Sequence, residues 1–271
     1  MRRRPRSCGE ACRPAAATWR CCAAGRQALR GAAPRGAAVR PAGRRVSFKP
    51  ISRAAWQRVL PFAFFIAVLA LRQLWQAHDP GFVADERWLY ALQAGGAALL
   101  LAWAWRHYVE LASAPRLRDV LLAVAMGVAV WWLWIALDAP WMRIATPVVL
   151  FRPVGEAGDV LWSLVAVRWL GATLVVPLME ELFWRSWLMR WLERADFLSV
   201  DPRTVGTTAV LASTFVFTLA HNEWFAAALA GLAYAGLYRH SGSLWSPVIA
   251  HAVTNGLLGV WVVMGGHWAF W

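Results

Sequence analysis

The sequence predicts an all-α fold, a polytopic bundle of about seven transmembrane helices preceded by a disordered basic tail. Of the 271 residues, 59% are hydrophobic and 16% are charged, whereas soluble globular proteins have about 45–50% apolar and about 25% charged residues. Several apolar runs reach about 18 residues, the length that can cross a bilayer. The chain also holds 20 tryptophans, a residue enriched at membrane interfaces. Together these observations indicate an integral membrane protein.

The formal net charge of +13 belongs to residues 1–53. This segment holds half of the 28 Lys and Arg residues and a single acid, Glu10. It is rich in Arg, Ala, Gly and Pro and has too few apolar side chains to fold. We interpret it as a disordered extension or an over-long reading frame; a basic arm on anionic lipid and a transit peptide are the alternatives. Because the rest of the chain is neutral, we expect no nucleic-acid partner.

The four cysteines also lie in this tail, at positions 8, 12, 21 and 22. Their spacing matches neither a paired zinc motif nor a disulfide framework. The membrane part of the chain contains no cysteine, which excludes thiol catalysis and a cysteine-ligated metal there.

The remaining chain divides into N-terminal transmembrane helices at 54–158 and a part at 159–265 that carries the polar motifs. The run at 159–194 is too long for one straight span, and the run at 224–238 is rich in Ala and Gly, which favours close packing in the centre of the bundle. Lys and Arg gather in alternate links, which predicts a cytoplasmic N-terminus. The predicted spans lie at about 56–75, 88–105, 120–137, 159–194, 204–221, 224–238 and 247–264.

Two adjacent acids, Glu180 and Glu181, lie within the apolar run 161–192. A charge at bilayer depth costs at least roughly 2.5–3.5 kcal/mol, so such residues usually have a function. Glu181 precedes Arg185 by four residues, the favourable order for an ion pair on one helical face. Glu180 points about 100° away and has no such partner. The spacing therefore predicts a structural role for Glu181 and a chemical one for Glu180.

Two further polar motifs follow on later spans, Phe217-x-x-x-His221 and His251-x-x-x-Asn255. His251 and Asn255 share one helical face. Each residue also has a structural explanation, since a histidine at a helix end is commonly an interface residue and an intramembrane Asn often joins helices. An unpaired acid, two histidines and an amide all require a polar environment, and one shared cavity would provide it.

The ordered motifs EExxxR, FxxxH and HxxxN resemble the CAAX-protease and bacteriocin-processing family of intramembrane endopeptidases, which includes the type II CAAX prenyl endopeptidase. The likeness covers roughly residues 160–260 and makes 159–265 a catalytic core. The Trp-rich composition is similar to the bacterial CAAX prenyl protease-related branch. The resemblance implies that Glu180 activates a water molecule, that His221 holds it, and that His251 and Asn255 stabilise the oxyanion. Glu181 and Arg185 would support the site.

Glu180, His221 and His251 are also acceptable zinc ligands in type and number. Because the chain has no HExxH motif, we expect a metal-free glutamate mechanism, with a metallopeptidase using zinc as the alternative. The expected substrate is a membrane-anchored or lipidated protein or peptide. The expected location is a bacterial inner membrane, with the N-terminus in the cytoplasm.

Two other functions remain open from the sequence. A non-catalytic membrane scaffold or bacteriocin-immunity protein could keep the same fold, and a transporter could use buried Glu and His as a proton relay. The sequence has no inverted repeat, which disfavours the transporter. In the predicted topology His221 ends a span running outward, whereas Glu180 and His251 lie toward the cytoplasm. Either the span at 204–221 is tilted, or it forms a partly inserted hairpin with the next one.

Overall fold

A computed structural model describes residues 52–78, 86–145 and 151–271. The tail at 1–51 and its cysteines lie outside the described residues, so the interpretation of that segment stays a prediction. The described part is helical and contains no strand beyond one isolated bridge between Val154 and Val160. The all-α prediction is therefore confirmed. A helix occupies the position of each expected span: α1 (Arg53–His78), α2 (Leu89–Ala104), α3 (Leu117–Ala136), the rod from α4 to α6, α7 (Thr207–Leu219), α8 (Trp224–Ser241) and α9 (Trp245–Gly265).

The rod is one continuous helical element, Trp162–Trp191, of 30 residues. Its α-helical parts are α4 (Trp162–Leu170), α5 (Val176–Glu181) and α6 (Met189–Trp191). Two π-helical segments, Gly171–Val175 and Leu182–Leu188, lie between them. Such wider turns are rare and are frequent at functional sites. Here they flank the short helix that carries both acids.

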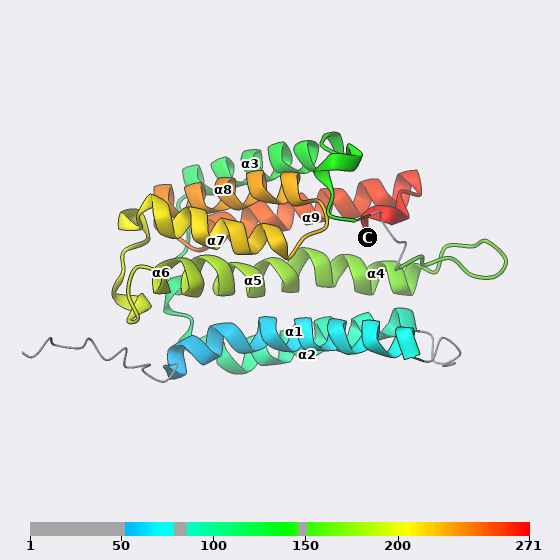
Figure 1. Cartoon of the computed structure of the whole chain (residues 1–271), viewed down its shortest axis with the longest axis horizontal. Coiled ribbons are helices and arrows are strands. Elements are labelled where there is room, and N and C mark those ends of the chain that lie inside the picture. The colour runs from blue at the N-terminus through cyan, green and yellow to red at the C-terminus, as the bar shows by residue number, and fades with distance from the viewer. Residues whose placement is uncertain (1–51, 79–85, 146–150) are drawn as a thin grey trace, which may run out of the picture. The chain divides into compact units, whose positions relative to one another are not determined.

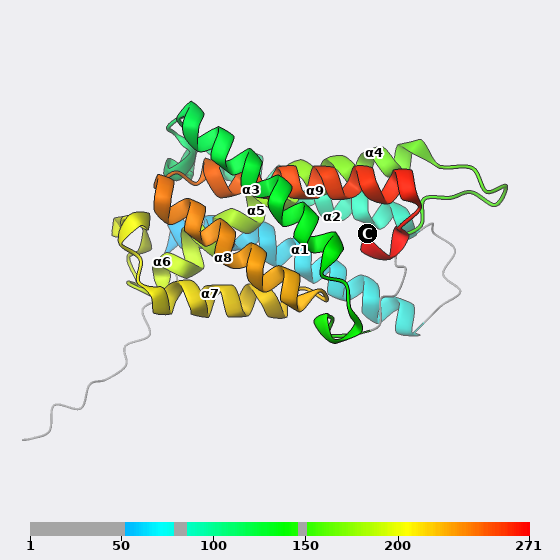
Figure 2. The ribbon, with the colours of Figure 1, turned by 90° about the horizontal axis from the view of Figure 1, so that it is seen from above.

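Four described helices are long and apolar enough to cross a membrane by length and composition, within Arg53–Leu74, Leu117–Ala136, Trp162–Trp191 and Trp245–Gly265. Helix α7 is apolar but has only 13 residues, about 20 Å of helix, which is less than the about 30 Å of a hydrocarbon core. Figures 1 and 2 show that the turn between α7 and α8 stops short of the end that α4 and α9 reach. The short α7 favours the hairpin over a tilted full span.

The rod lies between two groups of helices (Figure 1). On one side is the antiparallel pair α1 and α2, and on the other are α3, α7, α8 and α9. Within the second group α3 packs on α9 and α7 packs on α8. The rod therefore contacts both groups, and residues projecting from it can meet residues from either.

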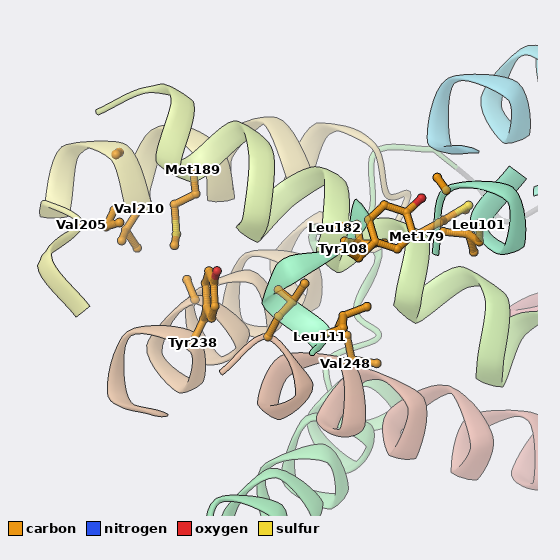
Figure 3. Close-up of a cluster of buried hydrophobic side chains, with 14 of the residues drawn as sticks. Leu101, Tyr108, Leu111, Met179, Leu182, Met189, Val205, Val210, Tyr238 and Val248 are labelled. Carbon is orange, nitrogen blue, oxygen red and sulfur yellow. The ribbon is translucent and has the colours of Figure 1, made fainter. Parts of the chain in front are cut away.

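A buried apolar cluster joins the rod to its neighbours (Figure 3). Met179, Leu182 and Met189 from the rod are fully buried in it. Between helices in a membrane, such a cluster stabilises through van der Waals packing. The other labelled members come from α2, the link after it, the link before α7, and helices α7, α8 and α9: Leu101, Tyr108, Leu111, Val205, Val210, Tyr238 and Val248.

Helix α8 packs closely, as its small residues predict. A Cβ atom on Gly231 would lie 2.8 Å from Cγ2 of Thr214 in α7. The contact of α3 with α9 is equally close, because a Cβ on Gly127 would lie 2.5 Å from the carbonyl oxygen of Ala250. At these two positions the helices approach to a distance that only glycine permits.

Candidate active site

A cavity of about 420 Å³ lies along the rod and brings the predicted site residues together. Glu180 from α5, His221 from the end of α7, and His251 and Asn255 from α9 all line it. These residues come from three segments separated by up to 75 positions in the sequence. The shared cavity that the sequence pattern requires is therefore present.

The two adjacent acids have different surroundings. Glu181 is fully buried, and its carboxylate meets the guanidinium of Arg185 with Nη1–Oε1 and Nε–Oε2 distances of 3.2 and 3.1 Å. The predicted ion pair is confirmed. Glu180 is 9% exposed and lines the cavity, and its Oε2 has no hydrogen-bond partner among the described residues. Of the two acids, Glu180 is therefore the one that lines the cavity without an ion-pair partner.

The buried carboxylate of Glu181 also holds His251. The Nδ1 atom of His251 lies 2.9 Å from Oε1 of Glu181, and its ring stacks on Tyr234 with the centroids 5.1 Å apart. Because an ionised carboxylate only accepts hydrogen bonds, Nδ1 must carry a proton and donate it. The free ring nitrogen of His251 is therefore Nε2. Sequence spacing did not predict this contact, since the two residues are 70 positions apart.

Asn255 is oriented by an irregularity in the rod. In the first π-helical segment the N–H of Val176 donates to the carbonyl of Gly171. The next bond in this register would run from residue 177 to Ala172, but Pro177 has no N–H to donate. Nδ2 of Asn255 donates to the carbonyl of Ala172 instead, at 2.9 Å. This bond fixes the amide of Asn255 and leaves its second N–H free.

His221 lies at the turn between α7 and α8. Its Nδ1 donates to the carbonyl of Phe217 at 2.8 Å, so Nε2 is the free ring nitrogen, and its ring meets Trp134 edge-on with the centroids 5.8 Å apart. The neighbouring Asn222 binds the segment after α3: its carbonyl accepts from the N–H of Ile144 at 2.8 Å and its Oδ1 from Ala145 at 3.0 Å. We call these contacts of Asn222 the latch.

Comparison with known proteins points to one family. Residues 162–257 match the family model described as type II CAAX prenyl endopeptidase Rce1-like. This segment of the chain is similar to the CAAX-protease family. It contains every site residue named above, and the likeness inferred from the three motifs is confirmed. No curated protein and no solved structure matches the chain.

The CAAX-protease segment and the four long apolar helices identify an integral membrane protein with a membrane-associated substrate. The family also indicates CAAX-type membrane proteolysis in general. Glu180, His221, His251 and Asn255 all fall on helices of this segment or on the turn within it.

The side chains that could bind a metal ion do not form a tight cluster in the described part of the chain. Across residues 52–78, 86–145 and 151–271 no three His, Cys, Asp or Glu side chains lie close enough together to hold a metal ion. Glu180, His221 and His251 nevertheless line one cavity. Nδ1 of each histidine is held by Phe217 or Glu181, which leaves Nε2 free, as is common for histidines that bind metal. The choice between a metal-free and a zinc mechanism stays a prediction.

A second polar network lies at the other end of the rod and was not predicted from the sequence. Glu110, in the link between α2 and α3, accepts hydrogen bonds from Arg58 of α1 at 2.7 and 2.5 Å and from Ser186 of the rod. Arg190 lies 4.0 Å away. Burial raises the pKa of Glu110, but the bonds from Arg58 and Ser186 outweigh it, so its pKa is lowered. This network ties α1 and the link to the rod.

Proposed function

We propose that this protein is a membrane endopeptidase that cleaves a membrane-anchored or lipidated protein or peptide by attack of a water molecule activated by Glu180. The observation that carries the proposal is the unpaired carboxylate oxygen of Glu180 in a cavity that His221, His251 and Asn255 also line. An ionisable group without a partner inside an apolar bundle is costly, which favours a functional explanation. The family match on residues 162–257 supports the same class of reaction.

In this mechanism Glu180 removes a proton from the water, whose oxygen attacks the carbonyl carbon of the scissile amide. The C=O electron pair moves to oxygen and forms a tetrahedral oxyanion. The C–N bond then breaks, and protonated Glu180 returns its proton to the leaving nitrogen. The products are a carboxylic acid and an amine. Glu180 alone carries the proton from the water to the leaving nitrogen and ends ionised, as it began.

The other side chains fit the remaining roles. The free Nε2 of His221 accepts a hydrogen bond from the attacking water, because its Nδ1 proton is held by Phe217. Asn255 offers its second amide hydrogen to the oxyanion. His251, held through Nδ1 by Glu181, donates from Nε2 to the oxyanion when its ring carries both protons. Removing one such donor costs about 10²–10³-fold in kcat.

The test is cleavage of a quenched fluorescent lipidated peptide by the full chain in detergent. We expect Glu180→Gln to abolish cleavage while its thermal unfolding stays near that of the wild type. Glu156→Gln makes the same chemical change at an exposed acid and is expected to leave cleavage unchanged. Equal rates for wild type and Glu180→Gln would rule out the glutamate mechanism.

Adding a chelator separates the catalytic types. Cleavage that is indifferent to chelator supports the metal-free mechanism. Cleavage that chelator abolishes and zinc restores would make Glu180, His221 and His251 metal ligands. A different result would favour the alternative function, a non-catalytic membrane scaffold or bacteriocin-immunity protein. In that case the folded wild type cleaves no member of a broad peptide set, and a cellular phenotype survives Glu180→Ala.

A further inference from the structure

Helix α3 lies outside the matched segment 162–257, yet it forms part of the wall of the catalytic cavity. It packs on α8 and α9 (Figure 2) with a buried stripe that includes Ala123, Gly127 and Val130. Trp134 continues this stripe by one turn and lines the cavity. Gly127 and Trp134 are seven positions apart, close to two helical turns, so they share one face. This face reaches the surroundings of both histidines of the cavity.

Trp134 holds the ring of His221 from outside α7. The two rings meet edge-on, with an angle of 77° between their planes and 5.8 Å between their centroids, an arrangement that aromatic rings prefer. His221 lies beyond the end of α7 at Leu219, and its other ring contact, Phe217, belongs to that same helix. A contact from a different helix is therefore what ties this turn residue to the rest of the bundle.

The ring of His251 is held on its face by Tyr234. The two rings are stacked, with an angle of 22° between their planes. The hydrogen bond from Nδ1 to Glu181 fixes one atom of the imidazole but lets its plane turn about that bond. The stacked ring removes this freedom. Tyr234 is itself 1% exposed, and its hydroxyl donates to Oγ1 of Thr254 at 2.8 Å.

Thr254 links this pair to α3. Because its hydroxyl accepts from Tyr234, its single proton goes to the backbone carbonyls of Gly127 and Ala250, at 2.9 and 3.0 Å. The bond to Gly127 crosses from α9 to α3. Such a bond needs a close approach of the two helices, which the missing side chain of Gly127 permits. A chain of contacts thus runs from α3 to the face of His251.

We propose that α3 positions both histidines of the cavity. It holds His221 directly, through Trp134, and His251 indirectly, through the bonds of Thr254. Reacting groups need side-chain orientations that neighbouring packing and hydrogen bonds lock in place. The proposal rests on the proposed function, because it assigns α3 a part in the geometry of that reaction.

The first test changes Trp134 in the full chain in detergent and measures cleavage of the quenched lipidated peptide. In Trp134→Leu we expect kcat to fall by about tenfold at unchanged KM, less than the about 10²-fold loss for a group displaced by 1 Å. Trp134→Phe keeps an aromatic ring and should restore most of kcat. Trp132→Leu makes the same change at an exposed position of α3 and should leave kcat unchanged. A loss carried by KM alone would make Trp134 a substrate contact and overturn its positioning role.

The second test removes the hydroxyl groups behind His251. In Tyr234→Phe and in Thr254→Val we expect kcat to fall by about two- to tenfold at unchanged KM, the effect of losing one neutral hydrogen bond. Both variants break the same bond, so the double variant should lose no more than Thr254→Val alone. Ser213→Ala removes a buried hydroxyl that is bonded to the carbonyl of Val210 in its own helix and should leave kcat unchanged. Losses that multiply in the double variant would overturn the link to α3.

A measurement without turnover separates this proposal from the proposed function. In inactive Glu180→Gln with ¹⁵N-labelled histidine, the ring nitrogen signals at about pH 8.5, above the range in which histidine ordinarily titrates, report which nitrogen carries the proton. His221 should carry it on Nδ1. Adding Trp134→Leu should mix the two tautomers, whereas adding Trp132→Leu should not, and this result supports the proposal even if no peptide is cleaved. An unchanged tautomer in Trp134→Leu, or kcat losses that only follow the loss of folded protein, would overturn it.

Discussion

His251 and Glu181 are joined by a hydrogen bond of 2.9 Å inside the protein, and the same carboxylate binds Arg185. Glu181 is thus a positioning residue that links the rod to α9. The acid next to it, Glu180, lines the cavity, and its Oε2 has no hydrogen-bond partner among the described residues. Two neighbouring residues of one type therefore have different surroundings, because helical rotation turns them in different directions.

Replacing Glu181 should affect the chemical step more than substrate binding. In Glu181→Ala we expect kcat to fall by about 10²–10³-fold, the effect of losing one oxyanion donor, because His251 loses its anchor. KM should change little, and Glu181→Asp should restore part of kcat. The measurement is steady-state cleavage alongside thermal unfolding. If KM and kcat both worsened in proportion to the loss of folded protein, the residue would be only structural.

Pro177 is expected to lower stability and support activity. Pro177→Ala restores an N–H that can bond to Ala172, so the helix should become more stable while Asn255 loses its fixed orientation. We expect a higher melting temperature and a kcat lower by up to about 10²-fold, as for a displaced catalytic group. Pro61→Ala in α1, also a proline within a helix, should raise the melting temperature without lowering kcat. Matching effects of the two variants on kcat would contradict this role of Pro177.

The network around Glu110 predicts a pH dependence of stability. The pKa of Glu110 is lower in the folded protein than its ordinary value, so its contribution is fully present above the unfolded pKa of about 4.3 and is lost as the pH falls through the folded value. Glu110→Gln should therefore flatten the acid side of a melting-temperature profile below about pH 5. At neutral pH it should cost about 3–5 kcal/mol, because Arg58 is left buried without its partner. An unchanged acid side would contradict the assignment.

A pair of glycines in α8 tests the close packing against α7. A Cβ on Gly231 would collide with Thr214, whereas a Cβ on Gly236 meets nothing within 4 Å. Gly231→Ala should cost about 1–3 kcal/mol through overpacking, and Gly236→Ala should stabilise by about 0.5–1 kcal/mol through helix propensity. Chemical unfolding of both variants measures the difference. Equal effects would show that α7 and α8 do not pack as described.

Local patterns in the sequence predicted the helices and the polar motifs because both depend on neighbours a few positions apart. The pairing of Glu181 with Arg185 follows from their four-residue spacing, and the packing of α8 follows from its small residues. The common cavity could also be predicted, because unpaired polar residues on apolar helices need a polar environment and one cavity can provide it for all of them.

The remaining features depend on contacts between distant segments. Nothing in the spacing of Arg58 and Glu110, 52 positions apart, predicts their ion pair. The spacing of polar and apolar residues did not predict the two π-helical segments of the rod. Proline did offer a local sign, because Pro177 within an apolar run implies a carbonyl that needs another donor. Arg168 was visible as a charge in the run, but its stacking on Tyr90 required the fold.

The latch at Asn222 limits how a substrate can reach Glu180. His221 is carried by a turn that is bonded to residues 144 and 145, and the next helix adds a bond from Nε1 of Trp224 to the carbonyl of Trp141. A route that opened by swinging the α7–α8 hairpin outward would break three hydrogen bonds and displace His221 from the reaction. Entry on the side of α1, whose Phe65 and Leu69 line the cavity, would leave all three bonds intact. Such a route would not require the α7–α8 hairpin to move.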